Sequence, residues 1–190
     1  MIRGFAIFLL RWALLLGLAM PAFGCAGGER SAVGQVRRVT PTAADSECIG
    51  DPKTPLCALD TLFACASRLD FALCGRIGIG EGDAEMLIGQ GPAGHDEWSQ
   101  TTREYVVTET TVVTDAWLDR ITDPYKKSSV RTGYVEISTI HRVCYDNIDP
   151  SDCIPWAVNK YIFKALDGDW QANSWEEHHS GYGIMFHTFP

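Results

Sequence analysis

The stretch Trp156–Trp175, WAVNKYIFKALDGDWQANSW, decides the fold of this chain. Its first half, 156–166, is dense in the aliphatic and aromatic side chains that favour strands. Asp167-Gly168 is a two-residue sequence typical of a tight hairpin turn, and the chain returns through a second strand that starts at Trp170. The stretch therefore predicts an antiparallel hairpin near the C-terminal end of the domain.

Two further strand blocks precede this hairpin. Residues 103–115 are rich in Thr, Val and Tyr, and residues 129–145 form a long block in which apolar and polar side chains alternate. Cys144 and Cys153 bracket the loop that joins the second block to the hairpin. A disulfide between them would fix the register of the two strands, so the blocks predict one antiparallel sheet.

The helical part of the fold lies before the strands. Between Leu56 and Leu69 apolar residues recur at the spacing of an amphipathic helix. Asp70 is placed to cap a second short helix, Phe71 to Cys74, which Gly75 ends. Helices followed by an antiparallel sheet predict an α+β domain.

Six of the seven cysteines fall into three pairs with equal spacing. The members of each pair are nine residues apart: Cys48 and Cys57, Cys65 and Cys74, and Cys144 and Cys153. We predict disulfide bonds, which persist in oxidising compartments and stabilise the fold by about 2–3 kcal/mol each when they close small loops. Metal binding is the alternative, although zinc sites usually place their cysteines roughly two to four residues apart.

Residues 1–24 have the pattern of a signal peptide, and the seventh cysteine follows them directly. A basic start at Arg3 precedes an apolar run that Arg11 interrupts, and residues 21–24 form a small, turn-prone exit. Ala22-Phe23-Gly24-Cys25 resembles the lipobox of bacterial lipoproteins, from which Phe23 departs. Because an unpaired exported thiol needs a role, we predict lipid attachment at Cys25. Plain secretion and an uncleaved anchor are the alternatives.

The rest of the sequence predicts a single acidic domain. We predict a flexible linker over 25–47, one α+β domain over 48–177 and a C-terminal tail over 178–190. The formal net charge of −8 makes nucleic acids and anionic lipid surfaces poor partners. The expected location is the periplasm or cell envelope of a bacterium, held by lipid, or else outside the cell.

Two segments resemble the nuclear transport factor 2-like superfamily. They are Ser67–Leu73, which leads from one helix into the next, and Tyr161–Trp170, a strand followed by an Asp-Gly turn and a Trp. The resemblance implies a cone-shaped fold in which N-terminal helices pack on a curved antiparallel sheet and ligands lie between them. The Gly-rich stretch 75–94 and the six paired cysteines depart from that pattern. A cystatin-like sheet on one helix and a β-sandwich are the alternative folds.

The chain offers one candidate pair for acid–base chemistry. His141 alternates onto a largely apolar face of the block 129–145, and an imidazole titrates in the range that general bases use. Glu109, on a face with Tyr105 and Val107, is positioned to oppose it across the sheet. The plainer interpretation is a core histidine with a backbone partner and a Glu109 that faces solvent.

Other candidates are weaker. The Gly-rich stretch 75–94 lacks the Lys-Ser/Thr of a phosphate loop, and we interpret it as a surface loop. The stretch is a candidate contact surface for a partner, together with Trp98, Trp117 and Trp156. Four residues near the C-terminus carry groups that bind zinc or copper: Glu176, His178, His179 and His187. Adjacent residues of an extended chain point oppositely, so we predict a solvated tail there, without a metal or cofactor.

No catalytic signature of the common hydrolase or metalloprotease types is present. The sequence therefore favours an exported cell-envelope protein that binds a small ligand or an envelope partner and is not an enzyme. The alternatives are a small isomerase or dehydratase with His141 as general base, and a purely structural envelope lipoprotein.

Overall fold

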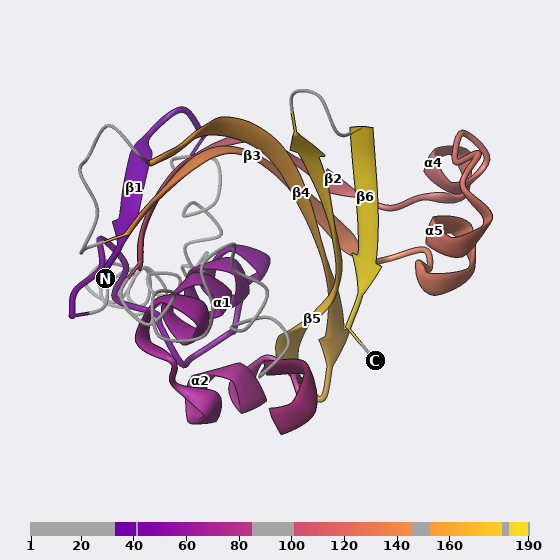
Figure 1. Cartoon of the computed structure of the whole chain (residues 1–190). Coiled ribbons are helices and arrows are strands. Elements are labelled where there is room, and N and C mark those ends of the chain that lie inside the picture. Colours follow the sequence, from indigo (N-terminus) through magenta and orange to yellow (C-terminus); the bar gives the residue numbers. More distant parts are fainter. Residues whose placement is uncertain (1–32, 41, 85–100, 146–152, 180–182, 190) are drawn as a thin grey trace, which may run out of the picture.

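The computed structural model describes residues 33–40, 42–84, 101–145, 153–179 and 183–189. Its six strands form one antiparallel sheet in the chain order β1-β2-β3-β4-β5-β6, with four named helices beside it (Figure 1). The predicted α+β class with an antiparallel sheet is confirmed. The elements are β1 Val36–Val39, α1 Pro55–Arg68, α2 Phe71–Arg76, β2 Thr101–Val112, α4 Asp115–Leu118, α5 Pro124–Ser129, β3 Val135–Tyr145, β4 Ile154–Leu166, β5 Asp169–His179 and β6 Gly183–Thr188.

Helix α1 organises the main core. Thr54 caps its first turn by accepting a hydrogen bond from the Cys57 amide, and Leu69 ends it in the left-handed conformation. The helix contacts strands β1 to β5, which bend around it in Figure 1. We call the face of the sheet toward α1 the inner face. The core between them includes Leu59, Leu62, Phe63, Tyr105, Ile137 and Phe163.

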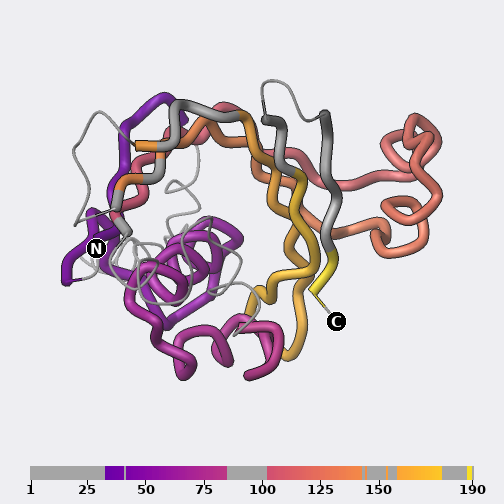
Figure 2. Tube along the Cα trace, viewed as in Figure 1, coloured from indigo at the N-terminus to yellow at the C-terminus, as the bar shows by residue number. Residues whose placement is uncertain are grey.

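The predicted hairpin is present as β4 and β5. Leu166 pairs with Asp169 across the turn, and both turn residues have positive φ, 53° at Asp167 and 88° at Gly168. Asp and Gly tolerate this conformation better than most residues, which is why they form a tight turn between antiparallel strands. Figure 2 shows the turn end of this hairpin beside α2, and the Ala172 amide of β5 donates to the carbonyl of Ile77, the residue after α2, at 2.9 Å.

All three predicted disulfides are confirmed. Cys48–Cys57 ties the segment before α1 to its first turn, and Cys65–Cys74 ties the end of α1 to α2. Cys144–Cys153 joins β3 to the residue before β4. Asp70 caps α2 as predicted, because its carboxylate accepts hydrogen bonds from the amides of Ala72 and Leu73.

Three boundaries differ from the sequence prediction. Strand β1 falls inside the expected linker 25–47, where four residues give too short a pattern to recognise. Strand β6 falls inside the expected tail 178–190 and pairs with β5. The block 129–145 begins as a strand only at Val135, because Ser129 still belongs to α5 and a turn with positive φ at Gly133 follows the helix.

A second, smaller core lies on the outer face of the sheet. Helices α4 and α5 project beyond the strands (Figure 1), and Trp117 packs there with Val113, Val130 and Ile162. The Lys126 ammonium lies 5.1 Å from the centre of the Trp117 ring. Trp117 was predicted as a contact surface, but it is buried because these two helices fold it against the sheet.

Candidate functional site

His141 lies on β3 and faces α1. Its side chain is buried, and its ring centre is 6.4 Å from that of Phe63 on α1, in an edge-to-face arrangement. Its cross-strand neighbours are Tyr105 on β2 and Ala157 on β4. The strand alternation therefore places His141 on the inner face.

Asn159 and Tyr161 complete a polar cluster around His141. The Asn159 amide nitrogen lies 3.0 Å from Nδ1 and 2.8 Å from Nε2 of the histidine, and 3.2 Å from the Tyr161 hydroxyl. The Tyr161 hydroxyl also lies 3.3 Å from Nδ1. An amide N–H needs an acceptor, so the arrangement suits a neutral imidazole, which keeps one nitrogen lone pair.

The Asn159 amide oxygen is the atom of this cluster that is most relevant to ligand binding. Asn159 is fully buried, yet Oδ1 has no hydrogen-bond partner among the described residues. A buried acceptor without a partner costs about 1–3 kcal/mol, and native proteins fill such positions with water or a ligand. The cluster therefore has an unused acceptor beside a ring and a hydroxyl.

Glu109 does not join His141. It is exposed, pairs across the strands with Ser138, and its carboxylate accepts a hydrogen bond from the Thr111 hydroxyl. The register shifts at Thr108, an extra residue between the pairs Val107–Thr139 and Glu109–Ser138. This bulge reverses the alternation of β2 and sends Glu109 to the outer face.

Asp60 is the buried carboxylate that sequence reasoning missed. It is fully buried on α1 and accepts a hydrogen bond from the Tyr105 hydroxyl, while Arg37 on β1 lies 2.6 Å from its second oxygen. Burial raises the pKa of the Asp60 carboxyl above its ordinary value. A hydrogen bond from Ser46 and the positive charge of Arg37 lower this pKa, but by less than burial raises it. The signal was available, since an aspartate inside the apolar run LCALDTLFA needs a buried partner.

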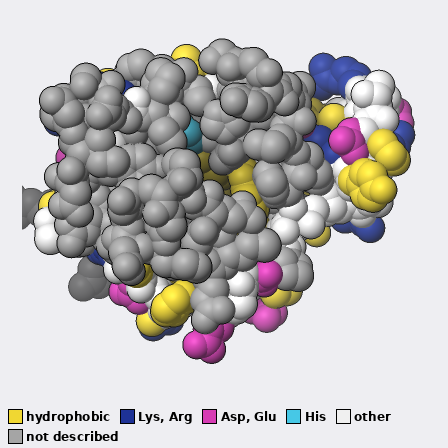
Figure 3. Space-filling model, viewed as in Figure 1, with side chains coloured by type: hydrophobic (Ala, Val, Ile, Leu, Met, Phe, Trp, Pro, Cys, Tyr) yellow, Lys and Arg dark blue, Asp and Glu magenta, His cyan; other side chains and the backbone are white. Residues whose placement is uncertain are grey.

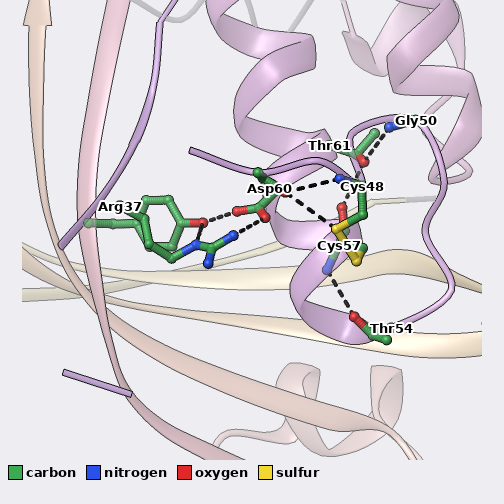
Figure 4. The surroundings of a disulfide bond; sticks show 9 residues. Arg37, Cys48, Gly50, Thr54, Cys57, Asp60 and Thr61 are labelled. Carbon is green, nitrogen blue, oxygen red and sulfur yellow. Dashed lines mark hydrogen bonds and ion pairs between the residues drawn. A yellow bond between two sulfur atoms is a disulfide. The ribbon is translucent and has the colours of Figure 1, made fainter. Parts of the chain in front are cut away.

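The Cys48–Cys57 disulfide lies beside this carboxylate (Figure 4). The Gly50 amide donates to the Thr61 hydroxyl 3.0 Å away, which in turn donates to the Cys57 carbonyl. The disulfide and these bonds hold the segment before α1 against the helix. Asp60 is therefore fixed in place from three directions: its own helix, β1 and β2.

Several predicted sites lie outside the described residues or side chains. They are Cys25, the stretch 85–94, and the side chains of Trp98, Trp156, His178, His179 and His187. Among the side chains that are described, no three His, Cys, Asp or Glu residues gather as metal ligands. On the surface, acidic side chains gather on the side of the molecule where α2 lies (Figure 3).

No helix in the described ranges has the length and apolar character needed to cross a membrane. No protein-family model, no curated protein and no solved structure matches this chain.

Proposed function

We propose that this protein is an exported, disulfide-braced domain of the bacterial cell envelope that binds a small ligand without catalysing a reaction. A lipid on Cys25 would hold it at the membrane. The proposed fold is the cone of the nuclear transport factor 2-like superfamily, with ligand bound between α1 and the curved sheet. The disulfides are consistent with export, because they require an oxidising compartment.

The observation that carries the proposal is the buried Oδ1 of Asn159, to which no side chain or amide of the described residues donates a hydrogen bond. His141, Asn159 and Tyr161 are polar groups on an inner face that is otherwise largely apolar core. A ligand with an N–H or O–H group satisfies Oδ1, and the surroundings of the cluster are apolar, since the Phe63 and Tyr161 rings pack edge to face there with centres 5.4 Å apart. The ligand class is therefore a small, mainly apolar molecule with one hydrogen-bond donor.

Catalysis by His141 has less support. Both ring nitrogens lie within hydrogen-bond distance of the Asn159 amide, and the carboxylate expected to assist, Glu109, is on the other face. Asp60, the buried carboxylate on α1, is engaged by Arg37 and Tyr105. A general base needs a ring nitrogen that is available to its substrate, so the geometry favours ligand binding over catalysis by His141.

The test is native mass spectrometry of the mature protein, extracted gently from the envelope of its own cells. Wild type should carry a mass above that of the processed chain, and Asn159→Leu should lose it because the acceptor is gone. Glu109→Gln is the matched control, since it alters a polar side chain on the outer face and should keep the ligand.

The Asn159→Leu variant should keep its three disulfides and unfold cooperatively. Its loss of ligand then cannot be attributed to misfolding. A wild type without added mass, together with a crystal structure that has only a water at Asn159 Oδ1, would contradict ligand binding and leave the cluster a structural role.

A further inference from the structure

The outer face of the sheet has an apolar stripe that runs across four neighbouring strands. The register pairs Val36 with Val106, Val106 with Ile140, and Ile140 with Val158. Directly paired residues point to the same face, so the four side chains form one row. Val36, Ile140 and Val158 are 54%, 37% and 43% exposed, and Val106 is half-buried.

Basic side chains are the more exposed charges on one flank of this stripe, and the other flank carries both signs. Arg38, Glu104 and Arg142 form the neighbouring row, in which the two arginines share the carboxylate of Glu104. The side chains of Arg38 and Arg142 are more exposed than that of Glu104. On the other flank, the Lys160 side chain is also more exposed than its partner Glu136. Exposed Glu109 lies in the same row as Lys160, because both pair with Ser138. Positive charge therefore dominates only the flank of Arg38 and Arg142, and the whole chain has a net charge of −8.

The chain length before the stripe brings it near the proposed anchor. Val36 is eleven residues after Cys25, and eleven residues span at most about 40 Å when fully extended. A domain tethered at Cys25 therefore has the start of the stripe within reach of the bilayer surface.

We propose that this stripe, Val36, Val106, Ile140 and Val158, rests on the surface of a zwitterionic phospholipid bilayer. The aliphatic side chains enter the boundary between headgroups and acyl chains, and Arg38, Arg142 and Lys160 reach the lipid phosphates. Anionic lipids weaken the contact, because the net negative charge of the chain is repelled by them. The inference rests on the lipid anchor at Cys25 in the proposed function. It gives the outer face a role in membrane contact, which is separate from ligand binding on the inner face.

The test places a fluorescent reporter on the stripe. Val158→Trp and the control Leu166→Trp are made in the full chain, and the mature proteins are reconstituted in phosphatidylcholine vesicles with dibrominated acyl chains. Both positions are exposed on β4, and they are about 26 Å apart at the usual strand rise. The emission added by each tryptophan is its difference from wild type.

Bromine quenches only over a short range, so the tryptophan at position 158 should lose most of its added emission and the one at position 166 should keep it. Equal quenching of the two, or quenching of neither, overturns the proposal. A dimer of the wild-type protein that is dissociated by the substitution Val158→Asp also overturns the proposal, because a second copy of the chain would then cover the stripe.

The anchor is tested separately. Partition of the mature protein between detergent and aqueous phases reports the lipid on Cys25. Protein found in the aqueous phase refutes the lipid anchor. In that case, quenching at position 158 with an excess of added vesicles still tests whether the stripe contacts the bilayer.

Discussion

Arg37 on β1 and Asp60 on α1 form a buried ion pair, with the guanidinium nitrogen Nη2 2.6 Å from the carboxylate oxygen Oδ2. Tyr105 on β2 bridges the two, because its hydroxyl accepts from Arg37 Nε at 3.0 Å and donates to Asp60. One carboxylate thus joins the helix to the two strands at the edge of the sheet. The pair acts with the β1–β2 ladder and the buried Val39 to hold β1, only four residues long, in the domain.

Arg37→Met should destabilise the protein by about 3–5 kcal/mol, because it leaves the Asp60 carboxylate buried without its charge partner. The measurement is urea unfolding of the mature protein near neutral pH. Arg37→Met combined with Asp60→Asn should recover part of the loss, since the buried charge is then absent. Equal losses in the single and double variants would show that packing of β1, and not the charge, sets the cost.

The raised pKa of Asp60 makes stability depend on pH. Burial places the folded-state pKa above the ordinary value of 3.8, so the folded protein holds this proton at pH values where the unfolded chain has released it. The contribution of Asp60 to stability is therefore greatest below pH 3.8 and falls as the pH rises through the folded-state pKa. A series of unfolding experiments on wild type and Asp60→Asn should show this fall in wild type only. A variant curve parallel to that of wild type would assign the effect to other groups.

Ser67→Ala should stabilise the protein by about 1 kcal/mol. Ser67 is fully buried on α1, and its hydroxyl has no hydrogen-bond partner within the described ranges, so the substitution removes an unsatisfied polar group. Ser129→Ala is the control, because the Ser129 hydroxyl donates to the Lys126 carbonyl at 3.0 Å and its removal should cost stability. Denaturant melts of both variants provide the comparison, and a loss of stability in Ser67→Ala would reveal a partner for that hydroxyl.

The disulfides should differ in their resistance to reduction. Cys65 and Cys74 are fully buried, whereas Cys48 and Cys57 are half-buried, and a reducing thiolate needs access to sulfur. Mild reduction of the folded protein followed by alkylation and mass spectrometry should label Cys48 and Cys57 before Cys65 and Cys74. The reverse order would mean that α2 opens more readily than the segment before α1.

Local patterns determined much of this fold. The Asp167-Gly168 turn, the Asp70 cap and the three cysteine pairs each depend on residues close in sequence, and each was predicted correctly. These features need only neighbouring groups: a backbone that accepts positive φ, a carboxylate near free amides, and thiols about one short loop apart. The same holds for α1, whose apolar spacing is visible in the sequence.

The candidate site was only partly predictable. His141 reached the inner face as its alternation indicated, but its partners Asn159 and Tyr161 come from β4, and their meeting depends on the register between strands. Glu109 faces solvent, as the plainer interpretation expected, and does not oppose His141, because a one-residue bulge at Thr108 that no sequence signal marked reverses the faces of β2.

The sequence by itself determined α1, α2, the hairpin, the disulfides and the α+β class, because these follow from short-range geometry, whereas α4 and α5 were not predicted. Only the tertiary structure decided that Asp60 meets Arg37 and that the buried Oδ1 of Asn159 has no donor within the described part of the chain. It also decided that Val36, Val106, Ile140 and Val158 align in one row. Each of these depends on which residues of separate segments come to lie opposite one another. That pairing is fixed by the register of the whole sheet and by its packing on α1.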